Sequence, residues 1–157
     1  MTKNKIITIF ALFLLFGCDY QPIYSIKNID KNNNFSINSI VFSGENKINQ
    51  YLKNNLSNYL NLELKKINYD LVINSKHQRK VSSKDKKGNP ERYISTIIFN
   101  IDFYEKDKLK GNKEFKKSYE YNNKSNKYEL KTYEQDVKNN LVDGLYENII
   151  DHLNYIQ

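Results

Sequence analysis

The feature that most constrains the fold is the long run from Arg92 to Glu105, in which side-chain character alternates at every step. Its odd positions from Tyr93 to Phe103 are aromatic, aliphatic or small, and its even positions mix apolar with polar residues. Successive side chains of a β-strand point to opposite faces, so this run predicts a strand with one face against an apolar core. A chain built around such a strand must supply a second layer to cover that face.

Three further segments are predicted to form strands. Phe35 to Ser43 is rich in β-branched and aromatic residues and ends at a glycine, while Tyr69 to Ser83 alternates before becoming polar and basic. The run from Lys84 to Arg92 combines Gly, Asn and Pro with charge and predicts the tip of a long hairpin. After a turn predicted at Lys106 to Asn112, Lys113 to Tyr121 alternates again, and its outward lysines are typical of an edge strand.

Two segments carry the periodicity of amphipathic helices. Between Glu45 and Lys66, apolar residues recur at steps of three and four, which stacks them on one side of a helix. A second stripe runs from Tyr128 to Tyr155 and is interrupted by Gly144, which weakens the helix locally or permits a close approach. The stripe residues are Ile48, Tyr51, Leu52, Leu56, Tyr59, Leu60 and Leu64 in the first helix, and Tyr133, Val137, Leu141, Leu145, Ile149 and Leu153 in the second.

The predicted order is therefore strand, helix, three strands, helix. This order predicts an α+β fold with a largely antiparallel four-stranded sheet and two helices packed on one face. We expect one domain at 35–157, preceded by a signal peptide at 1–17 and a tether at 18–34 that ends in the polar cluster Asp30 to Asn34.

The N-terminus has the features of a lipoprotein signal peptide. Lys3 and Lys5 precede an apolar run that ends at Phe16, which is too short to span a membrane. The sequence Leu15-Phe16-Gly17-Cys18 resembles the lipobox, in which the cysteine is lipidated before cleavage. Cys18 is the only cysteine of the 157 residues, so no intrachain disulfide can form and lipidation gives the thiol a use. We predict a chain anchored by acyl chains on Cys18.

The basic character of the chain suggests an anionic partner. Its net charge is +7, and loss of Lys3 and Lys5 with the signal leaves +5. Outside the cytoplasm, anionic partners are lipid headgroups and phosphorylated glycolipids rather than nucleic acid. An ordinary solvated, lysine-rich surface explains the same charge, and a plain hairpin tip explains the densest cluster. That cluster is the candidate anion-contacting region: Lys76, Arg79, Lys80, Lys84, Lys86, Lys87 and Arg92.

The sequence contains no pattern typical of a catalytic or metal site. His77 and His152 are the only histidines, they lie far apart, and neither has the spaced His, Asp or Glu neighbours that a metal ion or an acid–base pair needs. No nucleophile elbow or glycine-rich phosphate loop is present. We predict no cofactor and no enzymatic activity.

The segment after the predicted cleavage site resembles the start of the LPS-assembly lipoproteins, the LptE family. Many members begin with the lipidated cysteine, a glycine, an aromatic and a variable residue, followed by proline, an aliphatic residue and tyrosine. Here Cys18, Tyr20, Pro22, Ile23 and Tyr24 match that pattern. The resemblance implies an outer-membrane lipoprotein that plugs the LPS-assembly β-barrel, helps the barrel assemble and contacts lipopolysaccharide. The two tyrosines then face the membrane interface or the barrel wall.

Asp19 departs from this pattern, because many members have glycine there. Aspartate directly after a lipidated cysteine resembles the signal that retains some lipoproteins in the inner membrane. The alternative is therefore an auxiliary lipoprotein of an ABC-type envelope lipid transporter. Hydrolysis of a cell-wall or LPS fragment would instead indicate a glycan-modifying enzyme.

Overall fold

The computed structural model describes residues 34–63 and 65–156, and these residues form an α+β fold. The predicted signal peptide, Cys18 and the tether up to residue 33 lie outside the described residues. The element order matches the prediction, with one short 3₁₀ helix in addition. The elements are β1 (Phe35–Gly44), α2 (Asn46–Leu56), η1 (Ser57–Tyr59), β2 (Ile67–Lys84), β3 (Pro90–Glu105), β4 (Lys108–Asn122) and α3 (Lys127–Tyr155).

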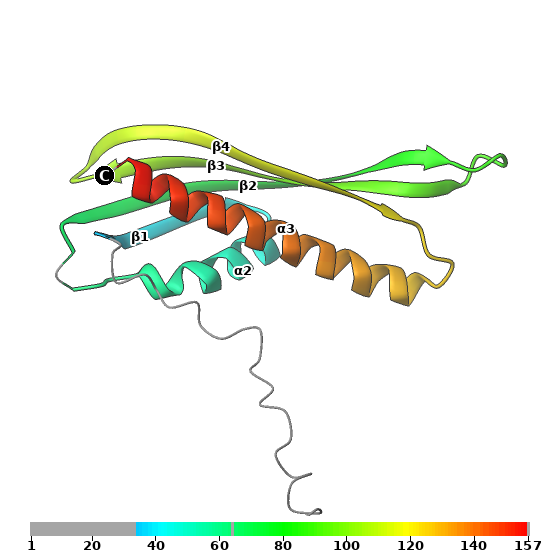
Figure 1. Cartoon of the computed structure of the whole chain (residues 1–157), viewed down its shortest axis with the longest axis horizontal. Coiled ribbons are helices and arrows are strands. Elements are labelled where there is room, and N and C mark those ends of the chain that lie inside the picture. The colour runs from blue at the N-terminus through cyan, green and yellow to red at the C-terminus, as the bar shows by residue number, and fades with distance from the viewer. Residues whose placement is uncertain (1–33, 64, 157) are drawn as a thin grey trace, which may run out of the picture. The chain divides into compact units, whose positions relative to one another are not determined.

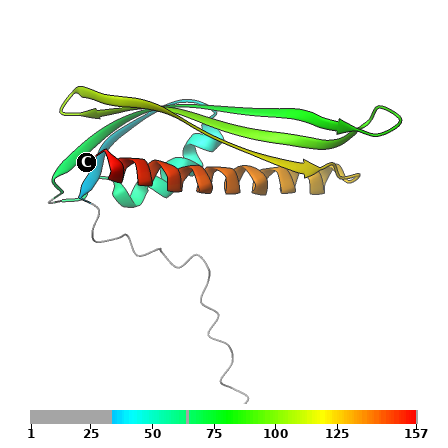
Figure 2. The ribbon, with the colours of Figure 1, turned by 45° about the horizontal axis from the view of Figure 1, so that its top comes forward.

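The sheet has four strands in sequence order, β1-β2-β3-β4, so β1 and β4 are its edges. β1 pairs with β2 in parallel across the α2 crossover, whereas β2, β3 and β4 are antiparallel. Both helices lie on the same side of the sheet, and the β2–β3 hairpin extends beyond β1 (Figures 1 and 2). The prediction of a largely antiparallel sheet with two helices on one face is confirmed.

The apolar core lies between the helices and the half of the sheet that includes β1. Odd positions of β2 and β3 point into it, from Tyr69 on β2 to Phe103 on β3. From α3 come side chains spaced four apart, as one face of a helix requires. The completely or almost completely buried members include Phe35, Ile37, Leu52, Leu56, Tyr69, Leu71, Ile73, Ile97, Phe99, Ile101, Phe103, Leu145, Ile149 and Leu153.

The first helix ends about ten residues earlier than the periodicity predicts. After η1 the chain becomes extended at Leu60, and Asn61 takes a positive φ of 51°. Leu60 forms a bridge with Ile37, and the Asn61 N–H donates to the Ile37 carbonyl at 2.9 Å. Backbone pairing along the edge of β1 therefore replaces the last helical turns, a tertiary effect that helical spacing alone does not reveal. Leu64 lies outside the described residues.

The prediction of a seven-residue turn at 106–112 is wrong. Lys106 and Asp107 have positive φ angles of 49° and 63° and alone connect β3 to β4, in the conformation that suits tight hairpins. β4 therefore starts at Lys108, and Gly111 lies within the strand opposite Phe103, next to a register shift. Gly111 and Asn112 mark this irregularity rather than the turn.

Candidate functional site

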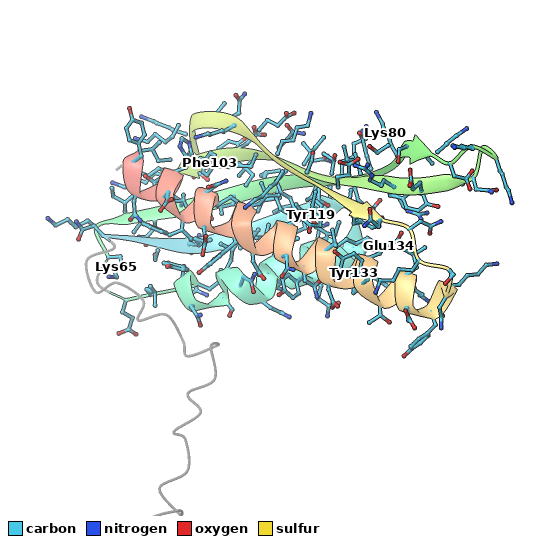
Figure 3. The ribbon with its side chains drawn as sticks, turned by 45° about the vertical axis from the view of Figure 1, so that its right-hand side comes forward. Lys65, Lys80, Phe103, Tyr119, Tyr133 and Glu134 are labelled. Atoms are coloured by element: carbon cyan, nitrogen blue, oxygen red, sulfur yellow. The ribbon has the colours of Figure 1, made fainter. Side chains whose placement is uncertain are left out.

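The predicted basic cluster lies on the β2–β3 hairpin, and the strand alternation divides it between two faces. Lys76 and Lys80 occupy even positions of β2 and point away from the helices, as Lys80 does in Figure 3, whereas Lys84 lies beyond two register shifts at the hairpin end. Arg79 occupies an odd position and points toward α3. The sequence-predicted cluster is thus not one surface, because Arg79 points to the opposite face from Lys76 and Lys80.

The hairpin tip holds Lys84, Lys86 and Lys87 around a well-ordered turn. Gly88 adopts the left-handed conformation with φ +85°, and its N–H donates to the Asp85 carbonyl at 3.0 Å. The Asp85 carboxylate accepts from the backbone N–H groups of Lys87 and Asn89, both at 2.8 Å. Hydrogen bonds from Asn89, led by its side chain, lower the pKa of Asp85. The Asp85 carboxylate therefore stabilises the turn, and the three lysines lie within or next to this turn in the sequence.

The outward lysines of β2 belong to a patch that spans three strands. Lys76 stands opposite Ile98, which stands opposite Lys116 of β4. Four residues along β2, Lys80 stands opposite Ile94. Side chains directly opposite one another across strands have Cβ atoms about 5 Å apart, so the residues within each row are neighbours, and the two rows lie roughly 13 Å apart along the strands. We name this group the lysine patch: Lys76, Lys80 and Lys116 around Ile94 and Ile98.

Lys116 was not among the predicted site residues. Its position on the patch follows from the pairing of β3 with β4, and the misplaced turn hid that register. Strand alternation does place Lys116 on the outward face, so the missing information was its partner. Arg92 lies farther along the same face, within 3.8 Å of Glu120. In the part of the chain that the structure describes, Lys76, Lys80 and Lys116 form no ion pair.

Arg79 points toward the helical layer and contacts residues of α3, β3 and β4. Its Nε lies 2.8 Å from Glu134 Oε1 of α3 and donates to the Tyr121 hydroxyl at 3.3 Å. Its guanidinium carbon lies 3.7 Å from the centre of the Tyr93 ring. The Tyr121 hydroxyl in turn donates to Glu134 at 2.9 Å, and burial followed by that bond raises the pKa of Tyr121 to about 12. Arg79 therefore links the hairpin to α3 through its ion pair with Glu134.

Both histidines lie in packed surroundings rather than in a reactive pair. His77 faces α3, with its Nε2 2.9 Å from the Ser95 hydroxyl, and burial followed by the charge of Lys138 lowers its pKa. His152 packs edge-on against Phe103 and Phe115, and burial again lowers its pKa. Within residues 34–63 and 65–156, no three His, Cys, Asp or Glu side chains gather as a metal site would require.

His77 and the Arg79 cluster form one continuous region between the hairpin and α3. We name it the polar layer: His77, Arg79, Ser95, Tyr121 and Glu134. It continues the helix-facing side of β2 and β3 beyond the apolar core. Through Glu134, the polar layer connects the first half of α3 to β2 and β4 by an ion pair and a hydrogen bond.

A hollow of about 280 Å³ opens between β4 and the middle of α3. Its α3 side is one helical stripe that runs from Tyr133 to Leu141, and its β4 side is Lys117 to Tyr119. We name it the tyrosine hollow, after Tyr119 and Tyr133, which lie beside each other in Figure 3. Its full lining is Lys117, Ser118, Tyr119, Tyr133, Asp136, Val137, Asn140 and Leu141.

Neither described helix has the length and apolar character needed to cross a membrane. No protein-family model matches the sequence, and no curated protein does.

Solved structures of three bacterial lipoproteins resemble the fold. A minor lipoprotein from Acinetobacter baumannii is similar with a TM-score of 0.58 and 11% identity, over 76% of this chain and 91% of its own. Rare lipoprotein B from Shewanella oneidensis gives a TM-score of 0.52 and 11% identity, over 73% and 96% of the two chains. A putative lipoprotein from Caulobacter crescentus gives 0.52 and 12% identity, over 74% and 88%. The chain therefore has the fold of these bacterial lipoproteins.

Proposed function

We propose that the protein is a non-enzymatic outer-membrane lipoprotein that forms a plug-and-barrel complex with the LPS-assembly β-barrel and contacts lipopolysaccharide during its transport. Two independent features support this proposal. The N-terminal sequence has the lipobox-like Leu15 to Cys18 and the matching residues that follow it. The described domain has the fold of three bacterial lipoproteins, although at these identities the likeness concerns the fold alone.

The observation that carries the contact with lipopolysaccharide is the lysine patch. Three lysines lie on the same outward sheet face as Ile94 and Ile98, which neither helix covers, and Glu120 stands opposite Ile94 at one end of the patch. Ammonium groups bind phosphate oxygens through charge-assisted hydrogen bonds, and the isoleucines offer apolar surface to an acyl chain. An amphiphile with phosphates next to acyl chains, such as lipopolysaccharide, presents both kinds of group at once.

The surface composition also suits a plug. A large outer-membrane barrel has a polar lumen. The exposed residues of the outward sheet face and of both helices are mostly Lys, Asn, Glu and Ser, with few large apolar side chains. Such a domain fills a polar lumen without leaving extended apolar surface unmatched.

Charge reversal tests the lysine patch. We expect Lys76→Glu/Lys80→Glu/Lys116→Glu to weaken binding of lipopolysaccharide to the detergent-solubilised full-length protein by about tenfold or more. The matched control is Lys53→Glu/Lys127→Glu/Lys131→Glu, which changes net charge equally on exposed helix positions. Equal affinity of the two triple variants at low salt would exclude the patch as the contact site. Arg79 is omitted because its reversal would break the tie to Glu134.

The second candidate is an auxiliary lipoprotein of an ABC-type envelope lipid transporter. The observation that favours it is Asp19, which follows the predicted lipidated cysteine. Membrane fractionation separates the two proposals: outer-membrane recovery supports the plug, and inner-membrane recovery supports the transporter. Asp19→Gly is the matched variant, because it would move the protein outward only if aspartate retains it.

A further inference from the structure

The tyrosine hollow lies at the free edge of the sheet. β4 has a neighbour on one side only. Lys117, Ser118 and Tyr119 follow one another in β4, so their side chains point alternately to the two faces. All three line the hollow, which therefore opens past the edge of the strand as well as toward α3. A ligand can enter it without moving either element.

Two tyrosine rings line the hollow, Tyr119 from β4 and Tyr133 from α3. Tyr119 is 50% exposed, and the proximity of its hydroxyl raises the pKa of Tyr133. Tyr133 is fixed from the other side, because Tyr121 packs edge-on against it at 5.9 Å and the Lys124 ammonium lies 4.8 Å from its ring centre. Tyr133 is thus held in one orientation on the α3 side of the hollow. Val137 and Leu141, each 4% exposed, provide an apolar floor.

Three polar side chains line the same hollow. Asp136 and Asn140 lie one turn apart on α3, and Lys117 faces them from β4. Among the residues that the structure describes, no side-chain hydrogen bond or ion pair engages these three. Together they offer an ammonium donor, a carboxylate acceptor and an amide that does both.

The position of Lys117 depends on Gly144. A Cβ atom at residue 144 would lie 2.0 Å from the Lys117 Nζ, so the side chain lies directly on the helix at this glycine. The end of the Lys117 side chain therefore lies against α3, one turn beyond Asn140. This contact is the close approach that the sequence allowed for at Gly144.

The combination selects a ligand with polar edges and an apolar face. A purely apolar ligand would leave the three polar groups unsatisfied, and an inorganic anion would lie near the Asp136 carboxylate. A sugar ring has hydroxyl groups around its edge and C–H groups on its face, and the C–H groups carry partial positive charge that suits the negative face of a tyrosine ring. The volume of the hollow, about 280 Å³, is just below the range of about 300–1,000 Å³ that is typical of ligand pockets, so it suits a single ring.

We propose that the tyrosine hollow binds one pyranose ring of the lipopolysaccharide oligosaccharide, with the ring face against Tyr119 and its hydroxyl groups bonded to Asp136, Asn140 and Lys117. The choice of glycan rests on the proposed function. The site itself is separate, because the hollow opens between β4 and α3 whereas the lysine patch lies on the outward face of the sheet.

Isothermal titration of the full-length protein in detergent tests the site, with deacylated and dephosphorylated lipopolysaccharide oligosaccharide as the probe. We expect binding that Tyr119→Ala weakens about tenfold, since the stacking surface is lost, and Asn140→Ala weakens to a smaller extent. Tyr119→Phe retains the ring and should retain most of the affinity. Tyr128→Ala is the matched control, because Tyr128 is 78% exposed on the same helix and does not line the hollow.

No binding of the probe would overturn the inference, as would equal losses in the Tyr119→Ala and Tyr128→Ala variants. Loss of probe binding in the lysine-patch triple variant alone would also overturn it, but would leave the proposed function in place. Conversely, binding that depends on Tyr119 in a protein that fails to bind intact lipopolysaccharide would retain the sugar site and contradict the proposed function. A thermal unfolding curve for each variant confirms that the fold is intact.

Discussion

The apolar core and the polar layer lie side by side beneath the same two strands. The core consists of apolar side chains, whereas the polar layer consists mainly of hydrogen-bonded and charged side chains. On β3 the helix-facing side chains run Phe103, Ile101, Phe99 and Ile97 in the core and then change to Ser95. On α3 the stripe from Leu153 to Leu141 gives way to Glu134. Burial of apolar area stabilises the first region, whereas hydrogen bonds with small net free energies hold the second. One half should therefore determine global stability, and the other half should open locally.

Truncation of a core side chain should have the largest effect. Leu145 is completely buried, so Leu145→Ala should lower the free energy of unfolding by about 2–5 kcal/mol. Urea denaturation of the full-length protein measures this. Tyr155→Ala is the control, since Tyr155 is 85% exposed and should change stability little. Similar losses in both variants would mean that the core is not where stability lies.

Glu134→Gln should act on the polar layer alone. The change removes the charge that faces Arg79, and we expect a loss of about 1–2 kcal/mol because hydrogen bonds to charged groups are lost. Hydrogen exchange should accelerate at residues 127–137 and stay unchanged at residues 145–153. Glu114→Gln, an exposed carboxylate on β4, is the control. Uniform acceleration along α3 would contradict the division into two regions.

Acidification should weaken the polar layer through His77. Its pKa is lowered in the folded protein from an ordinary value of 6.5, so near and below pH 6.5 the unfolded chain binds more protons. The free energy of unfolding should therefore fall as the pH drops through 6.5 toward the pKa of His77 in the folded protein. Well above pH 6.5, His77 should make no pH-dependent contribution. His77→Gln should flatten this dependence in part, since the lowered pKa of His152 contributes the remainder. If the His77→Gln variant had the same pH dependence of unfolding as the original protein, His77 would not be a source of that dependence.

Gly144→Ala should have the smallest effect and the opposite sign. Alanine favours the helix by up to about 1 kcal/mol, and only the flexible end of Lys117 must move. Thermal unfolding should show a slight stabilisation, while oligosaccharide binding weakens because the ammonium is displaced. Gly88→Ala is the contrast, because its φ of +85° makes alanine unfavourable there. If Gly144→Ala destabilised the protein, the Lys117 side chain would be unable to move away from the new methyl group.

Much of the fold could be predicted from alternation and helical spacing, because burial imposes a period on the sequence. The core positions of β3 and the stripe of α3 were predictable in this way. The end of α2 was not, because pairing of Leu60 with β1 outweighs an apolar stripe that continues past it. The turn at Lys106 was missed because lysine and aspartate adopt positive φ there while a glycine nearby does not mark the turn.

The candidate site was predicted less well than the fold. The cluster on the hairpin was visible as a density of charge, but alternation had to be combined with tertiary pairing to separate Lys80 from Arg79. Lys116 joins the patch only through the β3–β4 register. The tyrosine hollow brings β4 and α3 together, and no local pattern indicates which of the thirteen tyrosines meet.

The most direct test of the central claim is a mild-detergent pull-down of the tagged, lipidated protein from its own membranes, with bound proteins identified and quantified by mass spectrometry. The account predicts that a large LPS-assembly β-barrel is recovered in a ratio close to one to one. Recovery of ABC-transporter subunits in place of the barrel would contradict it.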